Sequence, residues 1–311
     1  MNRRSKELLW ALYGRLVMNS WTRRLLERCS YLKMITQSEA IIALRKREDK
    51  LDEFYWRGKL RHYGHALDKG LHRGDFSRGR GKRAYGLVKD ALSHVSSKEG
   101  RRDPSVVWAA RRIEQYEDFQ TNESAGIVAA YIKTTCRHDD LLDAIRTRRS
   151  VRQYLDRPID DETIKKIASV LDWSPTSCNR QPGRVYATSN PDLVRKCTTL
   201  HRGAACFTNI YAPMFLLFCA DARLYRMPVE WAMPYVDVAL GVQNCVLVAH
   251  TLGISLTLLT CATLGKRDER NLRKMFGIPK YFHIVVSAIG GYPNAGAEVP
   301  VRKNTELFLM K

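Results

Sequence analysis

Two short polar segments in the second half of the chain carry residue types that bind charged and polar ligands. The first runs from Arg146 to Tyr154, and after Arg146 it holds three further closely spaced arginines, Arg148, Arg149 and Arg152, with no acidic residue among them. Guanidinium groups bind phosphate oxygens in pairs, and each hydrogen bond to a charged group contributes about 1.5 to 3 kcal/mol. The cluster therefore predicts either an anionic ligand or a solvated basic helix end.

The second segment, residues 174–182, reads Ser-Pro-Thr-Ser-Cys-Asn-Arg-Gln-Pro and is expected to form a turn between a helix and a strand. It offers hydroxyls, two side-chain amides and free backbone N–H groups, which can bind the edge of a polar heterocycle. A third segment, residues 235–253, is apolar on nearly all sides and ends in Leu-Gly. This pattern predicts a buried helix, in the core or in a subunit interface.

The elements that must position these segments differ between the two parts of the chain. Residues 1–136 are expected to form a basic, mainly helical extension, with helices over 6–53, 84–94 and 106–131 and a glycine-rich loop over 61–83. Residues 137–311 are expected to form an α+β domain, in which helices flank a central mixed or antiparallel sheet. Its predicted helices are 141–148, 161–173 and 235–252, and its predicted strands are 185–188, 214–219, 254–259 and 284–289.

Composition limits the class of protein. The 311 residues are 45% hydrophobic, which suits a folded globular chain, and the eight cysteines form no Cys-x-x-Cys pair, so neither a disulfide framework nor a metal site is expected. The net charge of +20 is spread over both halves, and it predicts attraction to phosphates, nucleotides or acidic surfaces without selecting one. Nucleic acid is a less favoured partner, because the basic residues form no compact stripe interleaved with aromatic side chains.

The chain is expected to be cytoplasmic and to lack a transmembrane segment. Its first residues are basic, and arginines interrupt the apolar stretch that follows, unlike the core of a signal peptide. The longest apolar run, residues 204–220, contains Asn209 and Pro213 and is too short to span a bilayer by itself.

Together the three segments resemble the nitroreductase family of flavin enzymes, over residues 139–311. Arg-Arg-Ser-Val-Arg-x-Tyr is similar to the family's Arg-x-Ser-x-Arg/Lys-x-aromatic motif, and residues 174–182 are similar to its Ser-Pro-Ser-x-x-Asn-x-Gln-Pro loop. The apolar helix resembles the family's central dimer helix, and Pro300-Val-Arg-Lys-Asn resembles its terminal basic motif. The order and spacing of all four agree with the family pattern.

The resemblance implies an FMN molecule bound at a homodimer interface, with each site assembled from both subunits. It implies that Arg148 and Arg302 hold the FMN phosphate, with Lys303 as a further candidate. Arg149 and Ser150 would contact the phosphate, the ribityl chain or the ring.

The same resemblance implies how the flavin ring is held. Arg152 would face the N1 and C2 carbonyl edge, where a fixed cation stabilises the negative charge of reduced flavin. A helical ion pair with Asp156, four residues on, is the alternative for this side chain. The remaining contacts would come from the opposite subunit and, by backbone, from the end of a strand: Pro175, Thr176, Ser177 and Asn179, then Leu259 and Thr260.

The implied activity is hydride transfer from NAD(P)H, through the flavin, to a small-molecule acceptor of planar, nitro or quinone type. Residues 222–234, with Tyr225, Met227 and Trp231, are expected to form a variable lid over the site. Two positions depart from the family pattern. Gly183 stands where an aromatic residue is frequent, and Thr260-Cys261 stands where many members have an acidic residue and glycine.

These departures leave other reactions of the same fold open: dehydrogenation of a peptide heterocycle, reductive dehalogenation and flavin breakdown. A protein of a different class, which binds polyanions without catalysis, is the remaining alternative, and its binding would weaken steeply with salt.

Overall fold

A computed structural model describes residues 51–73, 75–122, 132–201, 204, 211–225 and 230–302. At its centre lies a four-stranded sheet in the order β1-β2-β4-β3, formed by β1 (Gly183–Thr188), β2 (Met214–Asp221), β3 (Ser255–Thr260) and β4 (Phe282–Gly291). Every neighbouring pair is antiparallel. The expected α+β class is therefore confirmed, and the described sheet is antiparallel rather than mixed.

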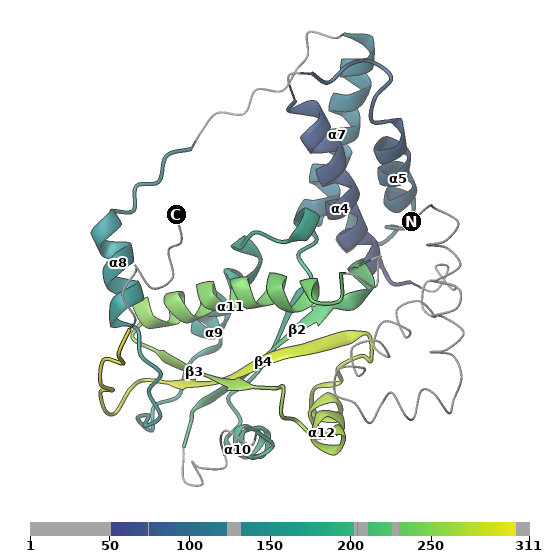
Figure 1. Ribbon diagram of the computed structural model, residues 1–311. Helices are drawn as coiled ribbons and strands as arrows, with labels where there is room; N and C mark the ends of the chain where they lie inside the picture. The colour runs from purple at the N-terminus through teal and green to yellow at the C-terminus, as the bar shows by residue number, and fades with distance from the viewer. Residues whose placement is uncertain are drawn as a thin grey trace, which may run out of the picture.

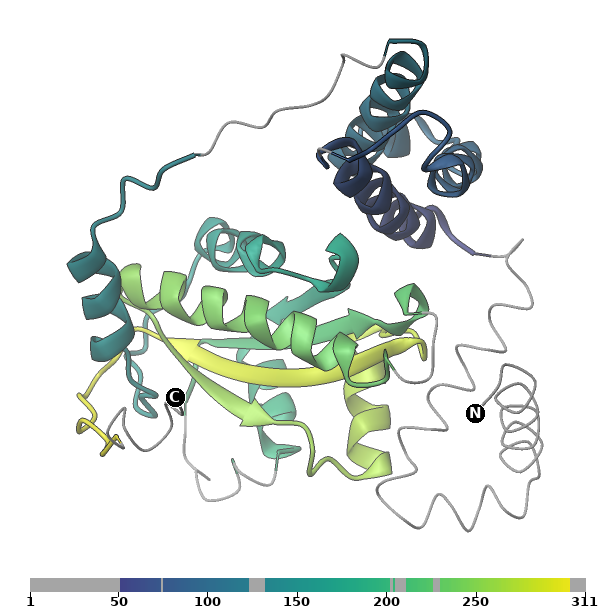
Figure 2. The ribbon, with the colours of Figure 1, turned by 45° about the horizontal axis from the view of Figure 1, so that its top comes forward.

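Helices cover both faces of this sheet (Figures 1 and 2). On one face α9 (Asp161–Ser169) and α11 (Met233–Thr251) pack on alternate residues of β2, such as Leu216 and Phe218. On the other face α10 (Pro191–Thr199) and α12 (Lys266–Phe276) lie over the intervening residues, such as Phe215 and Leu217. Because successive side chains of a strand point to opposite faces, β2 must be apolar throughout to be covered on both.

The described part of the N-terminal region contains four helices, α4 (Glu53–Leu71), α5 (Lys82–Ser93), α6 (Lys98–Arg101) and α7 (Pro104–Thr121). Helices α4, α5 and α7 share one apolar core, which Leu224 and Tyr225 from the second part of the chain complete. The helical character of this region agrees with the sequence, while the boundary at residue 136 stays a prediction. The helices expected over residues 6–53 fall almost entirely within residues 1–50, which lie outside the described residues.

The predicted loop over residues 61–83 is wrong for its first half, because α4 continues to Leu71. The glycines of α4 permit close packing instead of breaking the helix. A Cβ atom on Gly58 would lie 2.5 Å from Leu224, and one on Gly64 would lie 2.4 Å from Trp108. The true loop is the short stretch after His72, where Gly79 and Gly81 adopt left-handed φ values of 81° and 80°.

Most other predicted elements agree with the structure within a few residues at their ends. The helix predicted over 106–131 ends earlier, at Thr121, and residues 123–131 lie outside the described residues. The predicted helices appear as α5, α7, α8 (His138–Thr147), α9 and α11, and residues 171–173 add a short 3₁₀ turn to α9. Gly253, with a φ of 74°, follows the end of α11 as expected. Helices α10 and α12 were not predicted. In α12 the apolar stripe is short, because it consists of the buried Leu272 and the partly buried Met275 and Phe276 near the end of the helix.

No helix in the described ranges combines the length and the apolar character that crossing a membrane requires.

Candidate functional site

The arginine-rich segment after α8 is fixed to the sheet by two hydroxyl groups of β3. The Ser255 hydroxyl donates to the Arg149 carbonyl at 2.9 Å and accepts from the Val151 N–H at 3.1 Å. The Thr257 hydroxyl donates to the Val151 carbonyl at 2.6 Å. Ser255 and Thr257 are both buried, so these bonds are shielded from water and hold the segment in one position.

The structure brings Arg148, Arg149 and the distant Arg302 close together. Burial lowers the pKa of the half-buried Arg148, and the positive charges of Arg149 and Arg302 lower it further. Among the described residues, the Arg148 guanidinium has no carboxylate partner. Positive charges crowded in this way repel each other, and a negative charge placed among them would reduce this repulsion. Lys303, predicted beside Arg302, lies outside the described residues.

Arg149 has a different role from Arg148. Its guanidinium donates to the carbonyls of Arg146 and Arg148, at 2.5 and 2.8 Å. These are carbonyls at the C-terminal end of α8, where the helix leaves acceptors unsatisfied and a cation interacts favourably with the helix dipole. Arg149 thus caps α8, and its side chain has less freedom to reach a ligand than the motif predicts.

An open hollow of about 550 Å³ lies beside this cluster. Thr147 on one wall contacts His250 on the last turn of α11, with 2.9 Å between the hydroxyl oxygen and Nε2. The hollow is lined by Thr147, Arg149, Val151, His250, Ser255 and residues 293–297. It places space for a ligand directly against the arginine segment.

The second predicted segment forms a strained turn. Cys178, Asn179 and Gln181 have φ values of 53°, 55° and 48°, in the left-handed region that costs a non-glycine residue about 1 to 2 kcal/mol. Internal hydrogen bonds support the turn: the Gln181 N–H donates to the Thr176 hydroxyl at 3.2 Å, and the Gln181 amide donates to the Asn179 side chain at 2.8 Å. Such strain persists only where the surroundings impose it, and it is typical of ligand sites.

Asp237 in the first turns of α11 anchors this loop, and sequence reasoning missed it. Its carboxylate accepts from the Ser177 N–H and hydroxyl, both at 2.9 Å, and from the Tyr225 hydroxyl at 2.7 Å. Because the Ser177 hydroxyl donates its proton to Asp237, it can offer a ligand only its oxygen as an acceptor. The available signal was that Asp237 is the lone acidic residue in the apolar segment 235–253.

The arginine segment and the strained loop lie at opposite ends of α11. Asp237 holds the loop near the start of the helix, whereas His250 contacts Thr147 near its end. Thirteen residues separate these two positions, which corresponds to about 20 Å along a helix with a rise of 1.5 Å per residue. Figure 1 shows α8 beside one end of α11 and α4 toward the other. A single chain therefore does not bring the two predicted halves of the site together.

The remaining predicted residues take varied positions. Pro175 and Thr260 are exposed, Thr176 is half-buried, and the Leu259 side chain is buried in the core, which leaves its backbone to face a ligand. Arg152 donates to the Ser150 carbonyl at 3.3 Å. Residues 148–160 form no helix, so the alternative of a helical ion pair between Arg152 and Asp156 is wrong.

The expected lid over residues 222–234 is only partly consistent with the structure. Tyr225 is 4% exposed and bonds to Asp237, so it belongs to the core rather than to a lid. Trp231 is 44% exposed, and Met227 lies outside the described residues. The segment thus contributes a buried anchor as well as exposed surface.

Known proteins are similar to the part of the chain that holds the sheet. The Nitroreductase family profile matches residues 145–205 and 201–292. A protein of Methanothermobacter thermautotrophicus, whose name proposes an NADH dehydrogenase or NAD(P)H nitroreductase, is 32% identical over 170 residues, which cover 52% of this chain and 85% of that protein. The FMN reductase [NAD(P)H] of Bacillus subtilis is 25% identical over 50% of this chain and 66% of its own length.

Among solved structures, one from Desulfovibrio desulfuricans, described as a nitroreductase in complex with FMN, is 22% identical. The match has a TM-score of 0.46 and covers 58% of this chain and 98% of the other. The first relative exceeds 30% identity over most of its length, and the family profile spans the sheet and the arginine segment. The chain belongs to the nitroreductase family.

Proposed function

We propose that the protein is a flavin-dependent oxidoreductase, in which FMN accepts hydride from NAD(P)H and passes it to a small planar acceptor. The observation that carries the proposal is the meeting of Arg148 and Arg302, 154 positions apart in sequence, beside a hollow and with no carboxylate partner for Arg148 among the described residues. A phosphate group supplies the missing negative charge and fits the bidentate geometry of guanidinium groups.

The residues fit FMN with one adjustment to the roles that the motif implies. Arg148 and Arg302 hold the phosphate, with Lys303 as a further candidate, while Arg149 caps α8 and supports the segment from behind. Ser150 follows in the same anchored segment, between the carbonyl and N–H groups that Ser255 holds. The backbone of Leu259 and Thr260, at the far end of β3, then lines the ring.

When bound, FMN supplies the hydride-transfer chemistry, and the chain supplies placement and charge. Arg152 lies two residues beyond Ser150, outside any helix or strand, and we propose that it supplies a cation at the N1 and C2 carbonyl edge of the ring. Burial of Ser255 and Thr257 keeps water from competing for the bonds that fix this segment. The arrangement requires no nucleophile or metal from the protein.

A homodimer completes the site in this proposal. One side of α11 exposes apolar residues, including Val236 at 45% and Leu240 at 47%. A two-fold axis perpendicular to α11 on this face would run the two copies of α11 antiparallel, so that the start of one lies against the end of the other. The loop carrying Pro175, Thr176, Ser177 and Asn179 in one subunit would then meet the arginine segment of its partner.

The acceptor is assigned only as a class. Relatives include a chloronitrobenzene nitroreductase of Comamonas testosteroni, 40% identical over 65 residues that cover 20% of this chain. Gly183, where the family often has an aromatic residue, is closely packed, and a Cβ atom there would lie 2.5 Å from Leu171. The space that an aromatic side chain would fill is thus taken by the core. We propose a planar nitro or quinone compound.

The test is purification of the full chain, followed by measurement of flavin content and of NADH and NADPH oxidation with nitroaromatic and quinone acceptors. We expect a yellow protein that releases FMN on denaturation. Arg148→Gln and Arg302→Gln should each weaken FMN binding by about tenfold or more, the loss of one charge-assisted bond. The matched control is Arg146→Gln, on the exposed surface of α8. A colourless protein that cannot be reconstituted with FMN contradicts the proposal.

A further inference from the structure

Helix α4 of the N-terminal helical region contacts the strained loop directly. Arg61 on α4 is 8% exposed, and its Nε donates to the carbonyl of Arg180 at 3.2 Å. A second nitrogen of the same guanidinium donates to the Ser105 hydroxyl at the start of α7, at 2.9 Å. One buried side chain therefore joins two helices of the N-terminal region to the loop that carries Thr176 and Asn179.

The Arg180 carbonyl, which accepts from Arg61, lies in the strained part of the turn. Arg180 lies between Asn179 and Gln181, both of which have left-handed φ values. The Arg180 side chain is itself fixed, 4% exposed, with an ion pair to Glu230 at 2.8 Å. Since a peptide group can rotate only if its carbonyl is released, the bond from Arg61 restrains the turn at the point where its backbone is least favourable.

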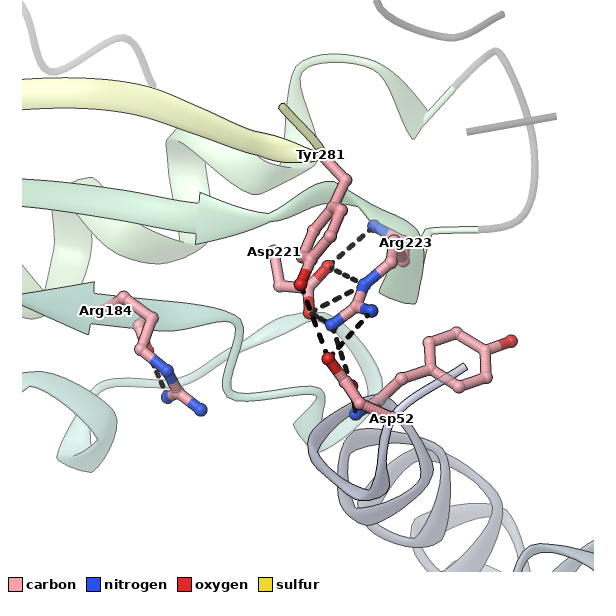
Figure 3. Close-up of polar contacts among 7 residues, drawn as sticks. Asp52, Arg184, Asp221, Arg223 and Tyr281 are labelled. Carbon is pink, nitrogen blue, oxygen red and sulfur yellow. Dashed lines mark hydrogen bonds and ion pairs between the residues drawn. The ribbon is translucent and has the colours of Figure 1, made fainter. Parts of the chain in front are cut away.

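A second contact fixes the start of α4 to the end of the same loop (Figure 3). Arg223 is 4% exposed, and its guanidinium pairs with Asp221 at 2.7 Å and with Asp52, the N-cap of α4, at 3.2 Å. The Arg223 guanidinium also lies 3.7 Å from the centre of the Tyr281 ring. The backbone N–H of Asp221 donates to the carbonyl of Pro182, the last residue of the loop, at 2.9 Å.

Arg184 on β1 adds a cation–π contact to the same junction. Its guanidinium carbon lies 3.1 Å from the centre of the Phe54 ring, in the first turn of α4. The loop is therefore held from α4 near its middle, by Arg61, and at its end, through Arg223 and Asp221. Because buried charge-assisted bonds to a backbone are stronger than exposed ones, α4 is placed to determine the conformation of the loop.

We propose that Arg61 is a positioning residue of the flavin site: by holding the Arg180 carbonyl, it keeps residues 176–181 in the conformation that binds FMN. The helical region over residues 53–121 is then a working part of the site rather than an appended module. This inference rests on the proposed function, because it assigns the loop to FMN.

The experiment compares two substitutions on α4 in the full-length protein. Arg61→Met keeps the length and packing of the side chain but removes its donors. Arg57→Met is the matched control, because Arg57 pairs with Asp103 of the helical region, at 3.1 Å, and within the described part of the chain it makes no hydrogen bond to the loop. We expect Arg61→Met to raise the FMN dissociation constant about tenfold, and Arg57→Met to leave it within about twofold.

A rescue variant separates positioning of the loop from general destabilisation. Cys178 is exposed and has a left-handed φ of 53°. Glycine adopts this conformation without steric cost, so Cys178→Gly should recover most of the FMN affinity that Arg61→Met loses. At saturating FMN, the kcat of Arg61→Met for NAD(P)H oxidation should return close to that of the wild-type protein, because the bound ligand then orders the loop.

The outcomes distinguish failure of FMN binding by the protein from failure of the positioning role of Arg61. If the wild-type protein binds no FMN, the proposed function and this inference both fail. If it binds FMN but Arg61→Met and Arg57→Met have equal affinities, or Cys178→Gly gives no recovery, the inference alone fails. Should Arg61→Met not fold, Arg61→Lys is the second variant, because it keeps the charge but has one donor nitrogen in place of the two that bond to Arg180 and Ser105. It should weaken FMN binding by about threefold, and an unchanged affinity would overturn the inference.

Discussion

At the scale of single residues, His283 on β4 is expected to make stability depend on pH. Its side chain is 6% exposed, and Nδ1 has no hydrogen-bond partner among the described residues. Burial, and then the positive charge of Arg273, lower the pKa of His283 to about 4 from an ordinary value of 6.5. The folded protein thus keeps this imidazole neutral at pH values where the unfolded chain protonates it.

The sign follows from proton linkage. Between pH 6.5 and about 4 the unfolded state binds more protons at this position, so the free energy of unfolding falls as the pH falls through this window. The full effect is about 3 kcal/mol. His283→Phe, which keeps a ring against Tyr235, should remove it.

Urea unfolding at several pH values between 4 and 7 measures this difference. The control is His94→Phe, where the imidazole is 40% exposed and stacks on Trp56. Carboxylates also titrate in this range, but their contribution cancels when each variant is compared with the wild-type protein. Equal pH slopes for wild-type and His283→Phe would contradict the prediction.

The residue types in the sequence predicted the arginine cluster, but the contacts that each arginine makes depend on the structure around it. The run from Arg146 to Tyr154 indicates a place for an anion, because it holds four arginines and no acidic residue. It cannot indicate that Arg149 folds back onto the carbonyls of α8, since that depends on where the helix ends. Nor can it indicate that Arg302 approaches Arg148, which depends on the course of the whole chain.

At the scale of elements, strand β3 is expected to hold the arginine segment through its hydroxyls. Ser255→Ala leaves the Val151 N–H and the Arg149 carbonyl without their partner, and Thr257→Val removes the donor to the Val151 carbonyl. An unsatisfied buried polar group costs about 1 to 3 kcal/mol. Ser255→Ala should therefore be the more destabilising of the two substitutions.

Both substitutions should also weaken FMN binding, because the segment that carries Arg148 loses its support. Thermal or urea unfolding and flavin titration measure the two effects on the same samples. Thr199→Val is the control, since its hydroxyl bonds only to a carbonyl of its own helix at an exposed position. If Ser255→Ala left stability and FMN affinity at wild-type values, β3 would not be the anchor.

Periodicity predicted most elements, and it failed where glycine or charge hides the pattern. In α4 the glycines replace apolar side chains at helix contacts, so the stripe is visible only when the partners Leu224 and Trp108 are known. In α12 the stripe is short, because only Leu272, Met275 and Phe276, at the end of a highly charged helix, pack on the core. The sequence shows Asp237 as the lone acid in an apolar helix. It does not show the three groups that donate to its carboxylate, the N–H and hydroxyl of Ser177 and the hydroxyl of Tyr225.

At the scale of the whole molecule, the fold separates what the sequence motifs suggest as one site. The sequence motifs assign the arginine segment and the polar loop to one site. The structure shows that the loop is anchored at Asp237 and the arginine segment lies near His250, about 20 Å apart along α11. If two copies of the chain share each site, the arginine segment acts within its own subunit and the loop acts in the partner. A dimer formed from two different variants can therefore test whether each site is shared between subunits.

Two variants with opposite defects should complement each other in a mixed dimer. Arg148→Gln removes a phosphate contact, and Asn179→Gly removes the amide of the loop while keeping its left-handed backbone. In a mixed dimer one site carries both substitutions, and the other has an intact arginine segment and an intact loop. We expect each variant alone to bind FMN weakly, and differently tagged, co-purified mixed dimers to bind one FMN per dimer with wild-type affinity. Dimers of Arg148→Gln carrying both tags are the control and should stay weak. If the mixed dimers gain no tight site, loop and arginine segment do not act across subunits, and the symmetric contact along α11 is wrong.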